Sequence, residues 1–213
     1  MPLSILDRVV VFDYGEVISR APSENDRMAI LAAAGFSVER SHDEHVTEFW
    51  ASYWAHRDEL DRGTISVPEY WQQIADETGH AWRASDIQSL WAADIRSWIS
   101  VEPATVDLLA ELNAGGTRMA LLSNAGFDFG TIFRYFPIAS FFERVFVSAE
   151  MDELKPDPAI YEEVAAALGI PLTSMVFIDN KSINTDAAAA LGITVHHFTG
   201  PDGLGRFLRS LAV

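Results

Sequence analysis

The stretch VVVFDYGEVISR, residues 9–20, runs from four apolar residues into an acid and then a glycine. A short β-branched run followed by a glycine-containing turn is typical of a buried β-strand. Asp13 stands at the end of this strand, two residues before Gly15. A buried strand that ends on an acid needs an explanation, and the other strands of the chain supply it.

Four more short apolar runs predict strands, and helical segments lie between them. The predicted strands are residues 8–12, 117–123, 144–148, 174–178 and 193–198, and the predicted helices cover residues 103–116, 157–169, 182–192 and the C-terminal stretch from Pro201. Strands that alternate with helices of this length indicate an α/β fold with a parallel sheet and helices on both faces. In such sheets the ligand crevice lies beyond the carboxyl ends of the strands.

The stretch 20–100 breaks this alternation. It has a helical pattern without a convincing buried strand, and it contains all six tryptophans of the chain. We interpret it as a helical cap inserted between the first two strands, so that residues 1–19 and 101–213 form the α/β core. Trp50 and Trp54 are four residues apart, a spacing that is more typical of core packing than of a ligand site.

Composition and charge exclude several classes of partner. Of the 213 residues, 49% are hydrophobic and 22% are charged, as in a folded globular protein. The formal net charge of −16 would repel nucleic-acid phosphates and anionic lipid, so we expect neither nucleic acid nor a membrane as a partner. There is no cysteine, and the N-terminus is unlike a signal peptide, so we expect a cytoplasmic protein. Both a monomer and a homodimer are compatible with the sequence.

Polar residues gather at the ends of the predicted strands and before one helix. They are Asp13, Ser123, Asn124, Lys155, Asp179 and Asn180. Because parallel strands end at the same edge of a sheet, we expect these side chains to converge there. A hydroxyl and an amide can hold phosphate-like oxygens, a lysine supplies a cation, and two carboxylates can share a divalent metal.

Four segments of the chain belong together: VVFDYGEVI (10–18), ALLSNAG (120–126), ELKPDPAIY (153–161) and MVFIDNKSINTDAAAALG (175–192). In order and spacing they resemble motifs I to IV of the haloacid dehalogenase (HAD) superfamily, and the insertion lies where that family carries its helical C1 cap. The resemblance implies a Rossmann-like core with an inserted C1 cap. It also implies a hydrolase in which an aspartate forms a covalent intermediate that water then hydrolyses.

The same resemblance implies a role for each site residue. Asp13 would be the nucleophile, and Lys155 would balance the charge of nucleophile and substrate. The phosphate-binding residues would be Ser123, Asn124 and Gly15, and the ligands of Mg²⁺ would be Asp13, the Gly15 carbonyl, Asp179 and Asn180. The expected substrate is a small phosphorylated metabolite.

Two positions depart from the family pattern. Where its phosphatases normally carry a second aspartate that protonates the leaving oxygen, this chain has Gly15, and where they usually carry a metal-binding carboxylate, it has Asn180. We therefore expect weaker Mg²⁺ binding. General acid–base assistance is worth about 10²- to 10⁴-fold, so its loss favours substrates with good leaving groups. Sugar-1-phosphate phosphatase-like members with a similar FDxGxV string fit this expectation.

Three alternatives stay open. Glu16, three residues after Asp13, could supply the missing proton, although an exposed turn residue is the commoner explanation for it. Dehalogenation would need neither proton nor metal, and Arg20 and Arg27 are arginines near the start of the cap that such an enzyme could use. A binding or regulatory protein on a weakened enzyme scaffold is the third alternative.

Overall fold

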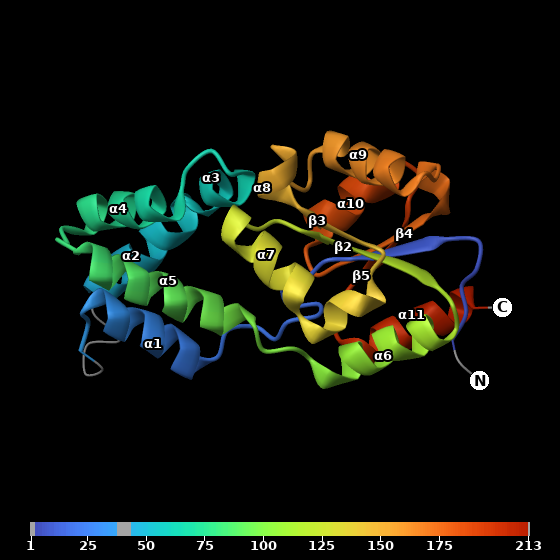
Figure 1. The fold of residues 1–213 in the computed structure, drawn as a ribbon, viewed down its shortest axis with the longest axis horizontal. Helices are drawn as coiled ribbons and strands as arrows, with labels where there is room; N and C mark the ends of the chain where they lie inside the picture. Colours follow the sequence, from blue (N-terminus) through green and yellow to red (C-terminus); the bar gives the residue numbers. More distant parts are fainter. Residues whose placement is uncertain (1–2, 38–43, 213) are drawn as a thin grey trace.

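The computed structural model describes residues 3–37 and 44–212, and at its centre lies a five-stranded parallel sheet (Figure 1). The strand order is β3-β2-β1-β4-β5, so the first strand of the chain lies in the middle of the sheet. Every neighbouring pair is parallel. The strands are β1 (Val9–Phe12), β2 (Arg118–Ser123), β3 (Arg144–Val147), β4 (Met175–Asp179) and β5 (Thr194–His197). The predicted α/β sheet is therefore confirmed.

Different helices cover the two faces of the sheet, because side chains alternate along each strand. Val10 and Phe12 pack with residues of one group of helices, and Val9 and Val11 pack with residues of the other. The first group is α6 (Pro103–Ala114), α7 (Phe127–Tyr135) and α11 (Pro201–Leu211), and the second is α9 (Pro158–Leu168) and α10 (Ser182–Ala190). Figure 1 shows α9 and α10 above the sheet, with α6 and α11 below it.

Four short elements between the strands were not predicted from the sequence. They are α7, the 3₁₀ helices η2 (Pro137–Phe141) and η3 (Leu172–Ser174), and α8 (Ser148–Met151). Helix α7 covers the start of the segment after β1, since its Phe129 and Phe133 are buried against the residues that follow β1. Phe133 lies against the ring of Tyr14, with 4.5 Å between the ring centroids.

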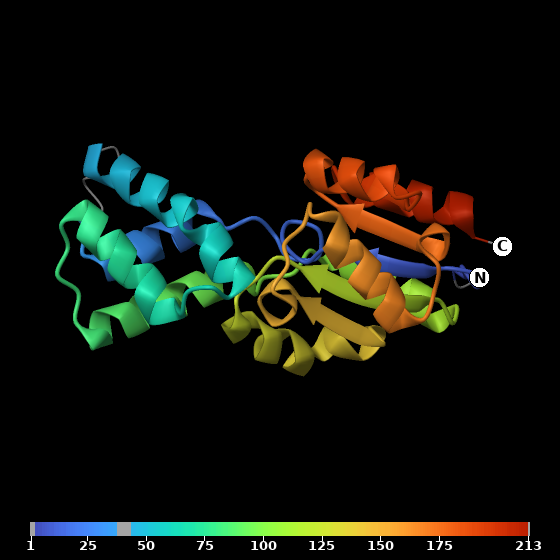
Figure 2. The same ribbon diagram turned by 90° about the horizontal axis from the view of Figure 1, so that it is seen from above.

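The helices of residues 20–100 form a separate body at one end of the molecule (Figure 2). They are α1 (Glu24–Ala34), α2 (Glu44–Ala55), α3 (Arg57–Arg62), α4 (Val67–Thr78) and α5 (Ala84–Trp98). This body has a hydrophobic core of its own, distinct from the two clusters that cover the sheet. Within the described part of the chain, no helix has the length and apolar character needed to cross a membrane.

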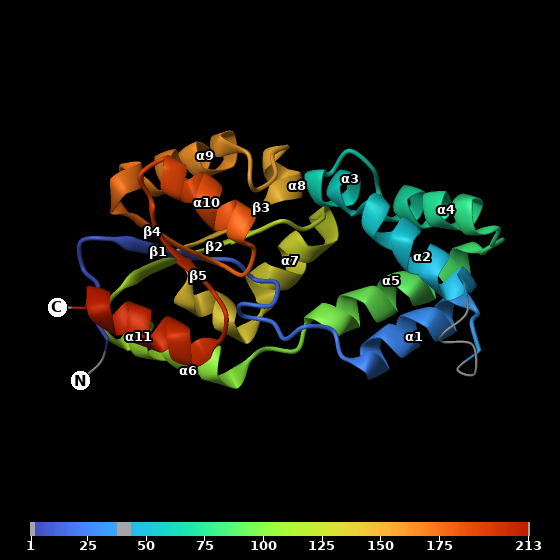
Figure 3. The ribbon, with the colours of Figure 1, turned by 180° about the vertical axis from the view of Figure 1, so that it is seen from behind.

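The chain passes between the sheet and the helical body along two segments that lie side by side (Figure 3). Ser19 and Val101 form an isolated antiparallel bridge, and the Arg20 N–H donates to the Ser100 carbonyl at 2.7 Å. We keep the boundaries at residues 19/20 and 100/101 as our proposed division into core and cap.

The tryptophans of the cap do not all pack as the sequence predicts. Trp71 is fully buried, and Trp50 and Trp82 pack against the cap core. Trp54 is instead 56% exposed, so the packing prediction is wrong for one member of the Trp50 and Trp54 pair. Trp54 lies on the side of α2 that faces the core, where it lines a cavity.

We predict opposite effects for two glycine-to-alanine changes. An added Cβ at Gly115 would lie 2.1 Å from the Leu3 carbonyl oxygen, whereas at Gly203, inside α11, its nearest neighbour is 3.9 Å away. Gly115→Ala should lower the free energy of unfolding by about 1 to 3 kcal/mol, because backbone must move. Gly203→Ala should raise it by about 0.5 to 1 kcal/mol. Urea denaturation measures both, and equal effects would contradict the prediction.

Candidate active site

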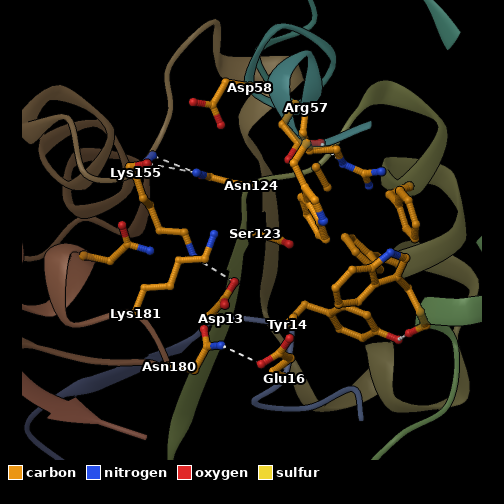
Figure 4. A pocket seen from close by; sticks show the side chains of 18 residues that line it. Asp13, Tyr14, Glu16, Arg57, Asp58, Ser123, Asn124, Lys155, Asn180 and Lys181 are labelled. Atoms are coloured by element: carbon orange, nitrogen blue, oxygen red, sulfur yellow. Dashed lines mark hydrogen bonds and ion pairs between the residues drawn. The ribbon is translucent and has the colours of Figure 1, made fainter. Parts of the chain in front are cut away.

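The predicted polar residues do converge at one edge of the sheet. Asp13, Ser123 and Asp179 stand at the carboxyl ends of β1, β2 and β4, which are neighbours in the sheet. Lys155 reaches them from the loop before α9, and its side chain is 1% exposed. Asp13 opens into a cavity of about 250 Å³ between the core and the cap (Figure 4).

The ammonium group of Lys155 lies between two carboxylates. Its Nζ donates to Asp13 Oδ1 at 2.7 Å, to Asp179 Oδ2 at 2.8 Å and to the Leu122 carbonyl at 3.1 Å. Burial opposes the charged form, but the two carboxylates outweigh it and raise the pKa of Lys155. The lysine therefore stays charged, and it binds three strand ends together.

Asp13 is a buried carboxylate with one cationic partner. Burial raises the pKa of Asp13 to about 6, against the attraction of Lys155 and with help from the nearby charge of Asp179. Loss of hydration destabilises the ionised form, and a lysine at hydrogen-bond distance restores part of that loss. The result is a carboxylate that is ionised near neutral pH, with little water around it, as a nucleophile requires.

Asp179 holds Lys155 and does not line the cavity. The residue is 0% exposed, its Oδ1 accepts the Lys181 N–H at 2.8 Å, and its Oδ2 accepts from Asn184 Nδ2 at 3.0 Å as well as from Lys155. Both oxygens of the carboxylate are thus engaged by the protein. In this structure Asp179 contacts Lys155, Lys181 and Asn184, and its role as a metal ligand stays a prediction.

Asn124 lines the cavity and is bound to the backbone of Lys155. Its Nδ2 donates to the Lys155 carbonyl at 2.9 Å, and its Oδ1 accepts the Lys155 N–H at 3.0 Å. The side-chain amide thus fixes the backbone of Lys155, and its second N–H remains available at the cavity, which Asn124 also lines. Ser123 is the residue of this pair whose side chain points into the cavity, although the residue is only 4% exposed (Figure 4).

The two departures from the family pattern lie next to one another in space. Gly15 lines the cavity, and a Cβ there would lie 4.0 Å from Asp13 Oδ2 and 3.9 Å from Trp98 Cζ3, so a side chain would fit. Glu16 is exposed, as expected for a turn residue, and has a left-handed φ of 57°. Asn180 Nδ2 donates to Glu16 Oε2 at 3.2 Å (Figure 4).

The oxygen atoms that face the cavity determine what metal it could hold. Asp13, Gly15, Glu16 and Asn180 all line it. No group of three or more acids or histidines suited to a metal occurs among residues 3–37 and 44–212. Mg²⁺ prefers oxygen ligands, keeps several waters and is commonly held by one or two carboxylates together with a substrate phosphate. The donor set fits such a weakly held Mg²⁺.

The wall of the cavity includes residues that the sequence did not single out as site residues. The cap contributes Trp54, Arg57, Asp58 and Asp61, and the core adds Tyr14, Ala125, Phe129, Phe133, Lys181 and Asn184, with Trp98 at the end of α5. The residues from the cap lie more than forty positions away from Asp13 in sequence, so no local pattern connects them with it. To predict these residues one would have to know that α2 and α3 face the core, and the sequence does not contain that information.

Arg57 is the cap arginine beside the cavity. Its Nη1 donates to Tyr53 Oη and to Asp94 Oδ2, both at 3.0 Å, and its Nε donates to Asp61 Oδ1 at 3.2 Å. Arg20 and Arg27, the arginines considered from the sequence, do not line the cavity. The guanidinium is neutralised by two buried carboxylates, so it holds α3 and α5 together within the cap.

Two contacts join the cap to the core next to the cavity. Ser148 Oγ donates to the Asp61 carbonyl of the cap at 2.5 Å and accepts the Ala125 N–H at 2.9 Å. Trp91 Nε1 of α5 donates to Asp128 Oδ2 of α7 at 2.7 Å. The loop that follows Ser123 is therefore tied to the same helices that roof the cavity.

Comparison with known proteins gives matches in sequence and in structure. Residues 64–198, more than half of the chain, match the family described as haloacid dehalogenase-like hydrolase. Flavin mononucleotide hydrolase 1 of the Arabidopsis thaliana chloroplast is 26% identical over 119 residues, which are 56% of this chain and 49% of that protein. The chain thus spans about half the length of this curated relative.

Solved structures with the same fold include enzymes of two kinds. A HAD family enzyme from Bacteroides thetaiotaomicron, in complex with magnesium and inorganic phosphate, has a TM-score of 0.67 at 22% identity over 89% of this chain and 92% of that one. The L-2-haloacid dehalogenase of Xanthobacter autotrophicus, with chloropropionic acid covalently bound, has a TM-score of 0.65 at 18% identity over 95% and 82%. At these identities the likeness concerns the fold alone.

We predict that the fold depends strongly on the charge of Lys155. Lys155→Met leaves two buried carboxylates without their cation, which should lower the free energy of unfolding by about 3 to 5 kcal/mol. In the double variant Asp13→Asn with Lys155→Met the loss should be smaller than the sum of the single losses, because only one carboxylate is left unpaired. Urea denaturation in the presence of a chelator measures the three values.

The control is Arg206→Met, which removes one positive charge from an exposed position of α11 and should change stability by less than about 0.5 kcal/mol. A Lys155→Met protein as stable as this control would refute the central position that we give to the ion pair.

Proposed function

This chain belongs to the haloacid dehalogenase-like hydrolases, and we propose that it is a phosphatase for a small phosphorylated metabolite. The observation that carries the proposal is the environment of Asp13. This carboxylate is fixed by Lys155, stands at the end of the central strand and opens into the cavity. A nucleophile held in this way can attack a substrate bound between the core and the cap.

In the proposed reaction Asp13 attacks phosphorus through Oδ2, since Oδ1 is bound to Lys155. The bond between phosphorus and the leaving oxygen breaks as the aspartyl-phosphate forms, and water then cleaves the new bond to release phosphate and restore the carboxylate. The Ser123 hydroxyl donates a hydrogen bond to an oxygen of the transferred group. Lys155 stabilises the negative charge of the site, and Asn124 keeps Lys155 in place.

We propose that Mg²⁺ assists this reaction and is held by Asp13, Gly15 and Asn180. Its chemical contribution when bound would be to neutralise charge that develops on the phosphoryl oxygens. Asp179, the remaining ligand expected from the sequence, would contribute through Lys155, because it is fully buried and does not line the cavity. The site has one carboxylate fewer than the family pattern, so Mg²⁺ should bind weakly.

The substrate that we propose has a good leaving group, for example a sugar 1-phosphate, an acyl phosphate or a phosphate anhydride. The reason is Gly15, which leaves the cavity without an acid at the position two after the nucleophile. An alkoxide leaves poorly unless it is protonated, and a positioned acid is worth about 10²- to 10⁴-fold. The acid that follows Gly15 directly in the sequence is Glu16, which accepts a hydrogen bond from Asn180 and is the candidate for the missing proton donor.

Dehalogenation is the second candidate, and the engagement of Asp179 favours it. Displacement of halide from carbon by Asp13 needs neither a leaving-group proton nor a metal. The lack of an acid at Gly15 and of a carboxylate at Asn180 would then not matter. We rank it below the phosphatase, because Arg57 is neutralised by Asp61 and Asp94 and so offers little charge to a haloacid carboxylate. A binding protein ranks lower still, since Asp13, Ser123 and Lys155 are all in place.

We predict phosphate release from a panel of sugar 1-phosphates, sugar 6-phosphates, nucleotides and acyl phosphates. Release should depend on Mg²⁺, fall in chelator and be fastest for the best leaving groups. Asp13→Asn should abolish it while the fold is retained, and Asp186→Asn, the same change at an exposed position of α10, should not. Release of halide from 2-haloacids in chelator, with no phosphate released from any compound, would replace our proposal with the second candidate.

We also predict that an acid can be restored. Gly15→Asp should raise kcat on a simple alkyl phosphate by about tenfold or more, within the range of general acid assistance, because the position has room for a side chain near Asp13. Gly15→Ala adds the same Cβ without the carboxyl group and serves as the control. If both variants behave alike, the missing acid does not limit the rate.

A further inference from the structure

The active-site cations cannot all serve the substrate. Lys155 carries three N–H donors, and Asp13, Asp179 and the Leu122 carbonyl take all three. The amide of Asn124 is engaged at both ends by Lys155. A phosphate monoester brings negative charge into a cavity that already contains Asp13, so a further donor of positive charge is needed.

Lys181 is in position to be that donor. It follows Asn180 at the start of α10, and its own N–H donates to Asp179 Oδ1 at 2.8 Å, which fixes its backbone to the site. Its side chain reaches into the cavity, toward the side on which Asp13 and Ser123 lie (Figure 4). In the described part of the chain, no carboxylate oxygen lies within 4.0 Å of its Nζ.

The composition of the chain makes this placement unusual. The sequence has thirteen arginines but only two lysines, and both lysines line the same cavity. In a chain with a net charge of −16, an exposed ammonium close to many acids would readily form an ion pair. Among residues 3–37 and 44–212, Lys181 instead forms no ion pair and lines the cavity. A flexible ammonium with three donors is suited to phosphate oxygens.

The field of Lys181 also extends to the roof of the cavity. Burial raises the pKa of Asp61 in the cap to about 6, and the charges of Arg57 and Lys181 both act against this rise. Lys181 belongs to the core, so its ammonium lies between the end of the sheet and the cap. A substrate enclosed between the two bodies would meet it.

We propose that Lys181 is a substrate-binding residue whose ammonium holds the anionic oxygens of the phosphoryl group, and this inference rests on the proposed phosphatase function. Because a site with Asn180 in place of a carboxylate should hold Mg²⁺ weakly, Lys181 supplies positive charge that a tightly held metal would otherwise provide. Lys155 then organises the nucleophile, and Lys181 contacts the substrate. The two lysines of the chain have separate tasks.

Binding of inorganic phosphate, measured by calorimetry with and without Mg²⁺, tests the proposal directly. Lys181→Met should weaken binding by about 10- to 100-fold, as expected for loss of a hydrogen bond from a charged group. Lys181→Arg should restore most of it. The control is Arg206→Met, which removes one positive charge from an exposed position of α11. In turnover assays Lys181→Met should raise KM more than it lowers kcat.

Amine labelling gives a second readout that needs no turnover. Lys155 is 1% exposed, so trinitrobenzenesulfonate should modify Lys181 as the accessible lysine, and mass spectrometry of its peptide follows the rate. Fluoroberyllate with Mg²⁺, or phosphate alone, should slow labelling of Lys181 without slowing that of the N-terminal amine.

The outcomes separate the two proposals. If the native protein neither binds phosphate nor releases it from any substrate, the phosphatase assignment fails, and this inference fails with it. If the native protein binds phosphate but Lys181→Met binds it equally well and labelling is not protected, the inference about Lys181 is overturned, and the phosphatase assignment stands.

Discussion

The site depends on one buried cation that is shared by two buried carboxylates. Without a cation beside them, the buried carboxylates of Asp13 and Asp179 would be costly to ionise. The Lys155 ammonium offsets this cost for both. Because these carboxylates end β1 and β4, and the third hydrogen bond goes to Leu122 of β2, the same contact fixes three strand ends relative to one another. Asp13, our proposed nucleophile, is thus oriented by the interaction that closes this edge of the sheet.

The two departures from the family pattern change the charge of the site in the same direction. Gly15 and Asn180 each replace an acid, so the cavity has lost two negative charges relative to the pattern. Asn180 can then donate to Glu16, which an aspartate at the same position would repel. The site is therefore less acidic than the family pattern, and under the proposed function more of the charge of a phosphorylated substrate must be met by side chains.

Much of the architecture could be predicted because the decisive strands are buried on both faces. Runs such as Val9–Phe12 and Met175–Asp179 leave little choice of structure. Since parallel strands end at one edge, the convergence of Asp13, Ser123 and Asp179 could be predicted as well. Hydrogen-bond partners could not, because they depend on rotations of single side chains.

Asn124 and Asp179 show this limit most clearly. Both were expected at the site, but their hydrogen bonds to Lys155 could not be predicted from the sequence. The wall supplied by Trp54 and Arg57 was out of reach for another reason, since it depends on how a separate helical body sits on the sheet. The chain enters the helical body after Ser19 and leaves it before Val101, and these two residues are paired with each other. Residues 20–100 leave and re-enter the core at almost one point, so a change in the length or packing of this segment need not alter the order of the strands.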